Sequence, residues 1–229
     1  LSVAMSGDGG DELFGGYNRH LLIPKIHSTF GKIPSLVKEG IVLAVKNNPL
    51  IDFLISKEKN QKLYSAISNS EDPAKIYNIL TTTGLSNSDL LRLKNCSNIE
   101  EIDKKFSDIS NISELIMLKD LITYLPFDIL VKMDRSSMAS SFETRAPFLD
   151  YRVAEYAWKI PIDYKLNNSG YKILGKLPLR SILNRYIPEK LINRKKNGFS
   201  IPLKSWLKGP LKSWAEELLD PDQISKQNY

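Results

Sequence analysis

The sequence has few of the residues that cross-link a small protein or hold a transition metal. It contains one cysteine, Cys96, and two histidines. One thiol cannot form an internal disulfide, and these three side chains fall short of the four ligands of a structural zinc site. Apolar runs such as Ile41–Val45 are far shorter than the roughly 20 residues that span a membrane. These absences predict a cytoplasmic domain with no membrane partner.

Repeats and low-complexity segments are also missing. The 229 residues are 42% hydrophobic and 25% charged, with 12 glycines and 12 prolines. This composition is ordinary for a globular domain and unlike that of a disordered or collagen-like chain. We expect one body over residues 1–219. A flexible tail is predicted over residues 220–229, which are polar and show no periodicity.

The net charge of +6 is concentrated in one part of the chain. Residues 172–214 contain eleven lysines and arginines against a single glutamate, so the remainder carries a net negative charge. Such a segment favours an anionic partner, such as a nucleotide phosphate or RNA, or forms a solvated helix face. The interleaved aromatic residues and motifs of RNA-binding modules are missing, so we expect no nucleic-acid partner.

Most of the chain has the periodicity of α-helices. Leu1–Met5 is an exception, because a short apolar run before a glycine-rich turn indicates a buried strand of a parallel sheet. No second strand follows nearby, so we expect this strand to pair with a segment outside the sequence. Pro126 is expected to interrupt one helix and start another through Met133. The predicted helices cover Leu36–Lys46, Ala74–Thr82, Leu90–Leu93, Asn111–Leu125, Val153–Lys159, Ile173–Tyr186 and Pro210–Leu219.

The glycine-rich turn after this strand is the most informative segment. It reads Ser-Gly-Asp-Gly-Gly-Asp-Glu over residues 6–12. Its glycines let backbone N–H groups approach a ligand, and a following helix would direct its positive end at that ligand. Acidic side chains suit such a site when a divalent cation bridges carboxylate and phosphate. The turn is not a Walker A loop. The alternative is a structural turn in which Asp8 and Asp11 cap the helix.

Three blocks of the sequence resemble the asparagine synthetase family. The first is SGDGGDELFGGYNRH at residues 6–20. The second is LPFDILVKMDRSSM at residues 125–138, continued by FETRAPFLD at residues 142–150. The third runs from YIPE at residues 186–189 to NRKKNGFS at residues 193–200. The blocks follow the family's order and are spread over nearly the whole chain.

The resemblance implies an α/β fold, with the chain as the C-terminal half of an adenine nucleotide alpha-hydrolase-like (HUP, ATP-pyrophosphatase) domain and the covered part mostly α-helical. Family members use ATP and Mg²⁺ to adenylate the side-chain carboxylate of aspartate and release pyrophosphate. Ammonia then attacks the acyl-adenylate to give asparagine and AMP. The implied partners are aspartate and ammonia. A glutaminase domain supplies the ammonia from glutamine. A homodimer is left open.

The resemblance also implies roles for individual residues. Ser6 and Gly7 would contact the nucleotide, and Asp11 would bind magnesium on the pyrophosphate side. Asp8 stands where the family usually has a glutamate linked to formation of the aspartyl-adenylate. Lys196 matches the lysine that stabilises charge on the α-phosphate and the leaving pyrophosphate, and nucleotidyl transfer depends on such stabilisation. Without the resemblance, the basic run around Lys196 would be interpreted as a solvated surface cluster.

Glu143 and Arg145 in the second block are candidates for binding the substrate. Side chains two residues apart do not share a face of a helix, so a joint role indicates a loop or a strand end. Pro147 agrees, because the residue before a proline avoids the helical conformation. Arg145 can grip a carboxylate, and Glu143 can bind an amino group or hold Arg145. The alternative is a buried structural ion pair.

Two parts of the family pattern do not occur in the sequence. It has neither the N-terminal cysteine of the glutaminase domain nor the Ser-Gly-Gly-x-Asp-Ser loop that binds the pyrophosphate of ATP. The chain therefore resembles part of a larger synthetase domain, and we expect it to be inactive alone. The alternatives are a relative that amidates another carboxylate or closes a β-lactam, and a non-catalytic remnant of the fold.

Overall fold

The computed structural model describes residues 2–46, 57–82, 109–167, 174–192 and 201–226. The contacts between these residues divide the chain into two units, Leu1–Tyr186 and Ile187–Tyr229. Both units are mostly helical, which confirms that part of the predicted fold class, and the described residues form one two-stranded sheet. The predicted domain bounds of 1–219 stay a prediction.

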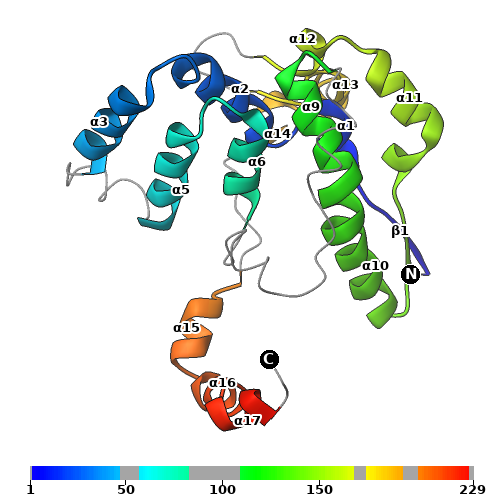
Figure 1. Ribbon diagram of the computed structural model, residues 1–229. Helices are drawn as coiled ribbons and strands as arrows, with labels where there is room; N and C mark the ends of the chain where they lie inside the picture. The colour runs from blue at the N-terminus through cyan, green and yellow to red at the C-terminus, as the bar shows by residue number, and fades with distance from the viewer. Residues whose placement is uncertain (1, 47–56, 83–108, 168–173, 193–200, 227–229) are drawn as a thin grey trace. The chain divides into compact units, whose positions relative to one another are not determined.

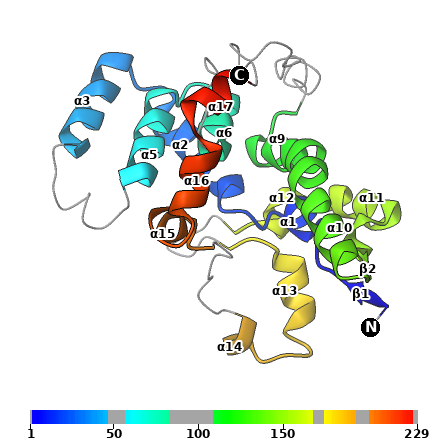
Figure 2. The same cartoon turned by 90° about the horizontal axis from the view of Figure 1, so that it is seen from below.

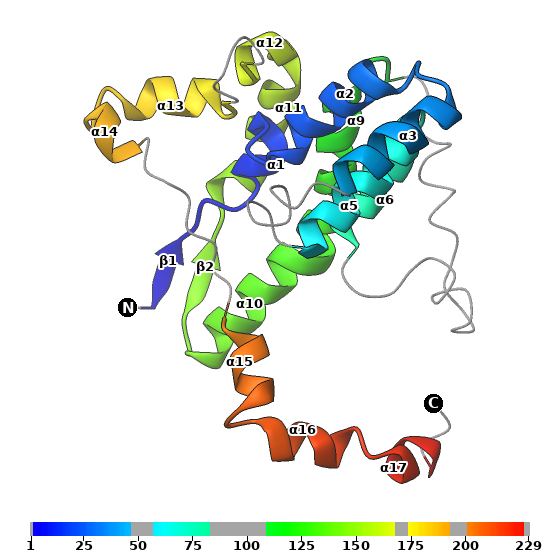
Figure 3. The same cartoon turned by 90° about the vertical axis from the view of Figure 1, so that its left-hand side faces the viewer.

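The sheet consists of two short parallel strands from opposite halves of the first unit. Strand β1 (Val3–Met5) pairs with β2 (Glu143–Arg145), with Val3 opposite Glu143 and Met5 opposite Arg145 (Figure 3). The expectation that β1 finds no partner within the sequence is therefore wrong, and completion of its sheet by a segment outside the sequence stays a prediction. The expected burial of β1 is also wrong among the described residues, because Val3 and Met5 are 47% and 75% exposed. The polar sequence of β2 has no apolar run that would have indicated a strand.

Three helices that are far apart in the sequence lie side by side in the first unit. They are α2 (Arg19–Phe30), α6 (Pro73–Thr81) and α9 (Ile112–Lys119) (Figure 1). Asp72 caps α6 by accepting a hydrogen bond from the Ala74 N–H at 2.9 Å. The apolar core between these helices and α5 consists of Ile23, Ile26, Ala66, Ile76, Tyr77 and Ile116.

Two helices extend this group. Helices α3 (Ser35–Lys46) and α5 (Lys57–Ser68) pack against each other around Val42, Tyr64 and Ile67. The predictions of helices at Leu36–Lys46 and Ala74–Thr82 are confirmed by α3 and α6. Helices α2 and α5 were not predicted. The predicted helix at residues 90–93 lies outside the described residues.

Helix α9 continues without a break into a π-helix, η1 (Asp120–Ile129), and then into α10 (Leu130–Ala139) (Figure 2). Pro126 lies inside η1, so the expectation that it separates two helices is wrong. A proline clashes with the carbonyl four residues earlier in an α-helix. The wider π-turn, in which the Leu130 N–H donates to the Leu125 carbonyl, accommodates the ring within a continuous helix. Helix α10 packs along β2.

The remaining elements of the first unit surround α1 (Gly10–Phe14). After β2 come a 3₁₀ turn, η2 (Pro147–Leu149), and α11 (Tyr151–Lys159), which confirms the helix predicted at Val153–Lys159. Leu13, Phe14 and Ala157 form the core between α1 and α11. Two short helices follow, α12 (Ile162–Lys165) and α13 (Leu177–Leu183), and α13 lies within the helix predicted at Ile173–Tyr186.

The second unit contains four short helices among its described residues. These are α14 (Glu189–Ile192), α15 (Leu203–Lys208), α16 (Lys212–Leu218) and α17 (Pro221–Lys226). Helix α16 falls within the helix predicted at Pro210–Leu219. Helix α17 occupies the segment predicted as a flexible tail, and its flexibility stays a prediction. No helix in the described ranges is both long and apolar enough to cross a membrane.

Candidate functional site

The glycine-rich turn lies where the two parallel strands end. The Ser6 N–H donates to the Arg145 carbonyl at 2.8 Å, which extends the β1–β2 ladder by one step. The turn therefore sits beside the segment that follows β2, and the first and second sequence blocks meet there. In open α/β sheets, ligands bind outside the carboxyl ends of the strands. The structure thus places the turn where a ligand site is expected.

Glycine is required where the turn packs on the second block. Gly9, which precedes α1, has a φ of +87°, a conformation that residues with a Cβ rarely adopt. A Cβ at Gly9 would come within 2.5 Å of the Leu149 side chain, and one at Gly10 within 3.3 Å of the Phe148 ring. The two glycines therefore let α1 start directly on η2.

The residues predicted to contact the nucleotide lie at the start of this turn. The Ser6 hydroxyl donates to the Met133 sulfur at 3.2 Å, so α10 also contacts the turn. Gly7 is exposed, and an added Cβ there would meet no atom within 4 Å. Asp8 is half-buried beside Gly7. The open space at Gly7 fits a close approach by a ligand, and the nucleotide roles of all three residues stay predictions.

Asp11, the predicted magnesium ligand, already faces a cation. Its Oδ2 lies 2.9 Å from the Nζ of Lys176, and both side chains are about one-third exposed. A carboxylate oxygen at a position that accommodates a cation is the type of ligand that magnesium prefers, with phosphate oxygens and water completing the shell. The described ranges contain no cluster of three or more His, Cys, Asp or Glu side chains. Whether Asp11 holds magnesium as a single protein ligand stays a prediction.

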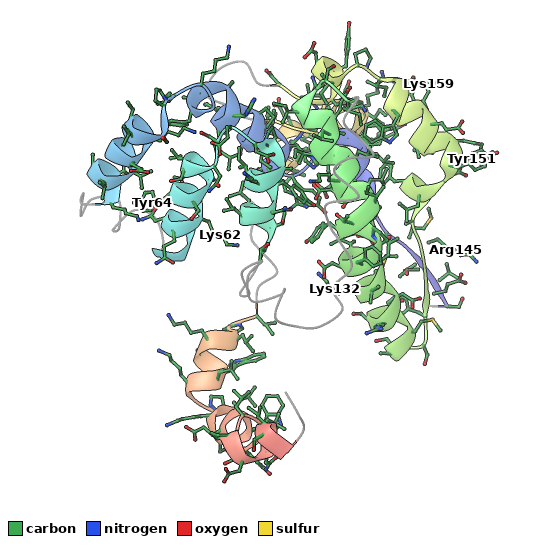
Figure 4. All side chains as sticks on the ribbon, in the orientation of Figure 1. Lys62, Tyr64, Lys132, Arg145, Tyr151 and Lys159 are labelled. Carbon is green, nitrogen blue, oxygen red and sulfur yellow. The ribbon has the colours of Figure 1, made fainter. Side chains whose placement is uncertain are left out.

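Glu143 and Arg145 point to the same side of β2 and form an ion pair. The Arg145 Nη2 lies 2.7 Å from the Glu143 Oε1, and the side chains are 68% and 51% exposed. Arg145 is labelled in Figure 4. The alternative of a buried structural pair is therefore wrong. The spacing of two residues places both side chains on one face because these residues form a strand. Whether they bind substrate stays a prediction. Lys196 lies outside the described residues, as do the other residues of the segment 193–200.

Glu12 belongs to the same turn but is buried. It is 1% exposed, and its Oε1 accepts a hydrogen bond from the Tyr17 hydroxyl at 2.8 Å. Burial raises the pKa of the Glu12 carboxyl, against the lowering effect of the Tyr17 hydrogen bond. Glu12 thus holds the turn from inside, while Asp8 and Asp11 remain partly exposed.

A buried charged cluster around Asp120 lies behind the turn. Asp120 is 0% exposed, and its Oδ2 accepts from Arg19 Nε and His20 Nε2, each at 2.7 Å. The Tyr77 hydroxyl donates to Oδ1, also at 2.7 Å. Burial alone would raise the pKa of Asp120, but the hydrogen bonds from His20 and Arg19 outweigh burial and hold this pKa below its usual value. One carboxylate therefore joins α2, α6 and η1.

His20 is fully buried in this cluster. Burial lowers the pKa of His20 despite the opposing effect of Asp120. Because the ionised Asp120 only accepts hydrogen bonds, the His20 Nε2 carries the proton. Its Nδ1 has no hydrogen-bond partner among the described residues. The cluster would therefore be disturbed when acid protonates the ring.

Arg19 connects the Asp120 cluster with the turn. Its guanidinium lies over the rings of Tyr17 and Tyr124, at 4.1 and 4.7 Å from their centroids. Tyr17 in turn holds Glu12. This path was not predicted from the sequence, although Tyr17 and Arg19 lie within the first block. An aromatic and a cationic residue directly after the acidic turn are the signal that could have found it.

An open pocket of about 640 Å³ lies elsewhere in the first unit. It is formed by α2, α12 and the start of α9, and none of its lining residues belongs to the turn. The residues that line it are Leu21, Pro24, Lys25, Ser28, Thr29, Ser110, Asn111, Ile112, Ser113, Ile162, Asp163 and Leu166.

Comparison with known proteins agrees with the three blocks. The family model of asparagine synthase matches residues 1–229. Asparagine synthetase (glutamine-hydrolyzing) 1 of Bacillus subtilis (strain 168) is 32% identical over 240 residues, which cover 97% of this chain and 34% of that protein. A putative asparagine synthetase (glutamine-hydrolyzing) of Mycobacterium bovis is 28% identical over 228 residues, which cover 94% of this chain and 32% of that protein.

A further relative matches less of the chain. Asparagine synthetase (glutamine-hydrolyzing) 3 of Bacillus subtilis is 26% identical over 200 residues, which cover 86% of this chain and 26% of that protein. No solved structure matches the chain. The chain thus spans about a third of the length of the first two relatives.

Proposed function

Because the chain belongs to the asparagine synthase family, we propose that it is part of an ATP-dependent asparagine synthetase. The proposed enzyme adenylates aspartate and transfers ammonia, derived from glutamine, to give asparagine, AMP and pyrophosphate. The observation that supports this proposal most directly is the meeting of the first and second blocks at the carboxyl ends of β1 and β2. The exposed Gly7, the partly exposed carboxylate of Asp11 and the exposed guanidinium of Arg145 lie around this edge.

In the proposed site, the turn binds the nucleotide. The open backbone at Gly7 admits the nucleotide closely, and Ser6 is fixed between β2 and Met133. Asp11 would hold magnesium, which neutralises charge on the phosphates when it is bound. Asp8 would lie beside the forming aspartyl-adenylate. Lys196 would stabilise the charge of the α-phosphate and the leaving pyrophosphate.

Arg145 would bind a carboxylate of aspartate. Its guanidinium presents several N–H donors in one plane. In the ion pair described above, the nitrogen that faces Glu143 is Nη2. Glu143 would orient this guanidinium and leave its other donors to the substrate. The exposure of the pair keeps the desolvation cost of adding an anionic substrate low.

The test of the proposal is aspartate-dependent release of pyrophosphate from ATP by the whole protein that contains this sequence. We expect Asp11→Asn and Lys196→Ala each to lower this release by about a hundredfold or more, with hydrolysis of glutamine unchanged. Asp163→Asn is the matched control, because Asp163 is an exposed aspartate on α12 and outside the turn. Unchanged release in Asp11→Asn would contradict its proposed role.

The same assay separates the alternatives. Release of pyrophosphate with another carboxylic acid but not with aspartate would indicate a related amidotransferase or a β-lactam-forming enzyme. No release with any acid would indicate a non-catalytic remnant. The 229-residue chain alone is expected to form no asparagine. The proposal includes the adenine nucleotide alpha-hydrolase-like fold, which the parallel β1–β2 pair supports, and a cytoplasmic location, and it leaves a homodimer open.

A further inference from the structure

Lys176 occupies an unusual backbone position beside the turn. Its φ of +59° and ψ of +35° are left-handed helical values, which residues with a Cβ rarely adopt. Its N–H donates to the Phe14 carbonyl at 3.0 Å, at the end of α1. Such a conformation persists only where the surroundings determine it, and residues of this kind gather at functional sites.

Two glycines bring the Lys176 segment against α1. A Cβ at Gly175 would overlap the Gly15 carbonyl, so the two backbones are in direct contact only because residue 175 has no side chain. A Cβ at Gly16 would overlap both the Asp11 carboxylate and the stem of Lys176. The Arg180 Nε donates to the Gly175 carbonyl at 2.9 Å and fixes this loop from α13. The backbone thus brings the Lys176 side chain close to Asp11.

The ammonium lies where a divalent cation would bind Asp11. Lys176 Nζ is 2.9 Å from Asp11 Oδ2, and both groups are reached by solvent. A lysine ammonium and a magnesium ion cannot share one carboxylate oxygen closely, because their charges repel. Lys176 has a flexible four-carbon stem, so its ammonium can leave Asp11 without a change in the backbone.

We propose that Lys176 is a positioning residue of the proposed nucleotide site, which neutralises and orients the Asp11 carboxylate in the absence of a divalent cation and yields it when the cation arrives with ATP. This inference rests on the proposed function. A metal-free turn would otherwise present an unbalanced negative charge to a polyphosphate. The lysine keeps this charge balanced and holds the carboxylate in place.

A purely structural tie between α13 and α1 is the competing explanation. The Lys176 N–H and the Gly175 contact already join these segments through the backbone. Lys176→Met keeps both and nearly the length of the side chain, and it removes only the charge. Lys176→Arg restores the charge. Lys159→Met is the matched control, because Lys159 is an exposed lysine on α11 (Figure 4).

The experiment measures ATP binding by calorimetry to the whole protein that contains this sequence, once with a chelator and once with excess magnesium. We expect Lys176→Met to weaken metal-free ATP binding about tenfold, since Asp11 is then unpaired, and to weaken magnesium–ATP binding about twofold or less. The double variant Asp11→Asn with Lys176→Met should recover metal-free binding, and Lys176→Arg should behave as the unmodified chain. Equal losses with and without magnesium would overturn the inference.

Binding of Mn²⁺ alone, followed by electron paramagnetic resonance, separates this inference from the proposed function. We expect Lys176→Met to bind Mn²⁺ several-fold more tightly, because the ammonium no longer competes for the carboxylate. Addition of Asp11→Asn to Lys176→Met should abolish this gain. Unchanged or weaker Mn²⁺ binding in Lys176→Met overturns the inference even where ATP binds. Failure of the unmodified whole protein to bind magnesium–ATP counts against the proposed nucleotide site, whatever the Mn²⁺ result.

Discussion

Two carboxylate–guanidinium pairs in the first unit have the same N–O distance, but one is buried and the other is exposed. Arg19 and Asp120 are 2.7 Å apart, with side chains 18% and 0% exposed. Arg145 and Glu143 are also 2.7 Å apart, but their side chains are 68% and 51% exposed. Distance alone would rank the pairs as equal. Burial makes the two pairs different in energy. Charges in a dry interior interact strongly, and a buried charge without a partner is strongly destabilising.

The difference extends to what each pair can do. Asp120 receives hydrogen bonds from two residues of α2 and one of α6, so its partners hold helices together. The Glu143–Arg145 pair lies on a strand of three residues and is open to solvent. An exposed guanidinium can exchange a solvent contact for a substrate carboxylate at low cost. The buried pair is therefore suited to stability and the exposed pair to binding.

The largest expected effect comes from breaking the buried pair. Asp120→Asn removes the charge that compensates Arg19 and replaces one acceptor oxygen by a donor facing the same partners. We expect the free energy of unfolding to fall by about 3 kcal/mol, as when one partner of a buried ion pair is removed. Urea denaturation of the chain measures this change. Asp163→Asn should leave stability within about 0.5 kcal/mol, and a similarly small change in Asp120→Asn would contradict the comparison.

A smaller change in the free energy of unfolding is expected when the pH is lowered. The pKa of His20 is lowered on folding by burial, so the unfolded chain binds a proton more readily than the folded chain. The resulting stability is present above the unfolded pKa of about 6.5 and is lost as the pH falls below that value. We expect the free energy of unfolding to decrease between pH 7 and pH 5. His20→Gln, whose amide can still donate to Asp120, should flatten this part of the profile. An unchanged slope would show that other groups cause it.

The glycine-rich turn could be predicted from the sequence, but the sheet that positions it could not. The turn is a local pattern of glycines and acids, and its departures from ordinary backbone geometry at Gly9 follow from the residue type. The spacing of Glu143 and Arg145 indicated a loop or a strand end, but the pairing of β2 with β1 could not be predicted, because Glu-Thr-Arg has no apolar alternation and its partner lies in the opposite half of the unit. Parallel pairing depends on contacts that are distant in sequence.

The Asp120 cluster was missed for a related reason. Arg19 and His20 are ordinary polar residues by position, and Asp120 lies inside a helical stripe where a solvent-exposed aspartate would look the same. Only the packing of α2, α6 and η1 gives the carboxylate its three partners. The π-helix was hidden in the same manner, because Pro126 predicts an interruption whenever an α-helix is assumed.

The smallest effect on stability is expected at the exposed pair, where the effect on function should be large. Glu143→Gln should change the free energy of unfolding by no more than about 0.5 kcal/mol, because exposed ion pairs contribute little. In the whole enzyme, the same substitution leaves Arg145 without its charged partner and should raise the KM for aspartate about tenfold, with the KM for ATP unchanged. Arg145→Lys keeps the charge but loses the planar donors, so it should raise the KM for aspartate as well. A loss of stability with an unchanged KM would reverse the assignment, because the exposed pair would then be structural despite its contact with solvent.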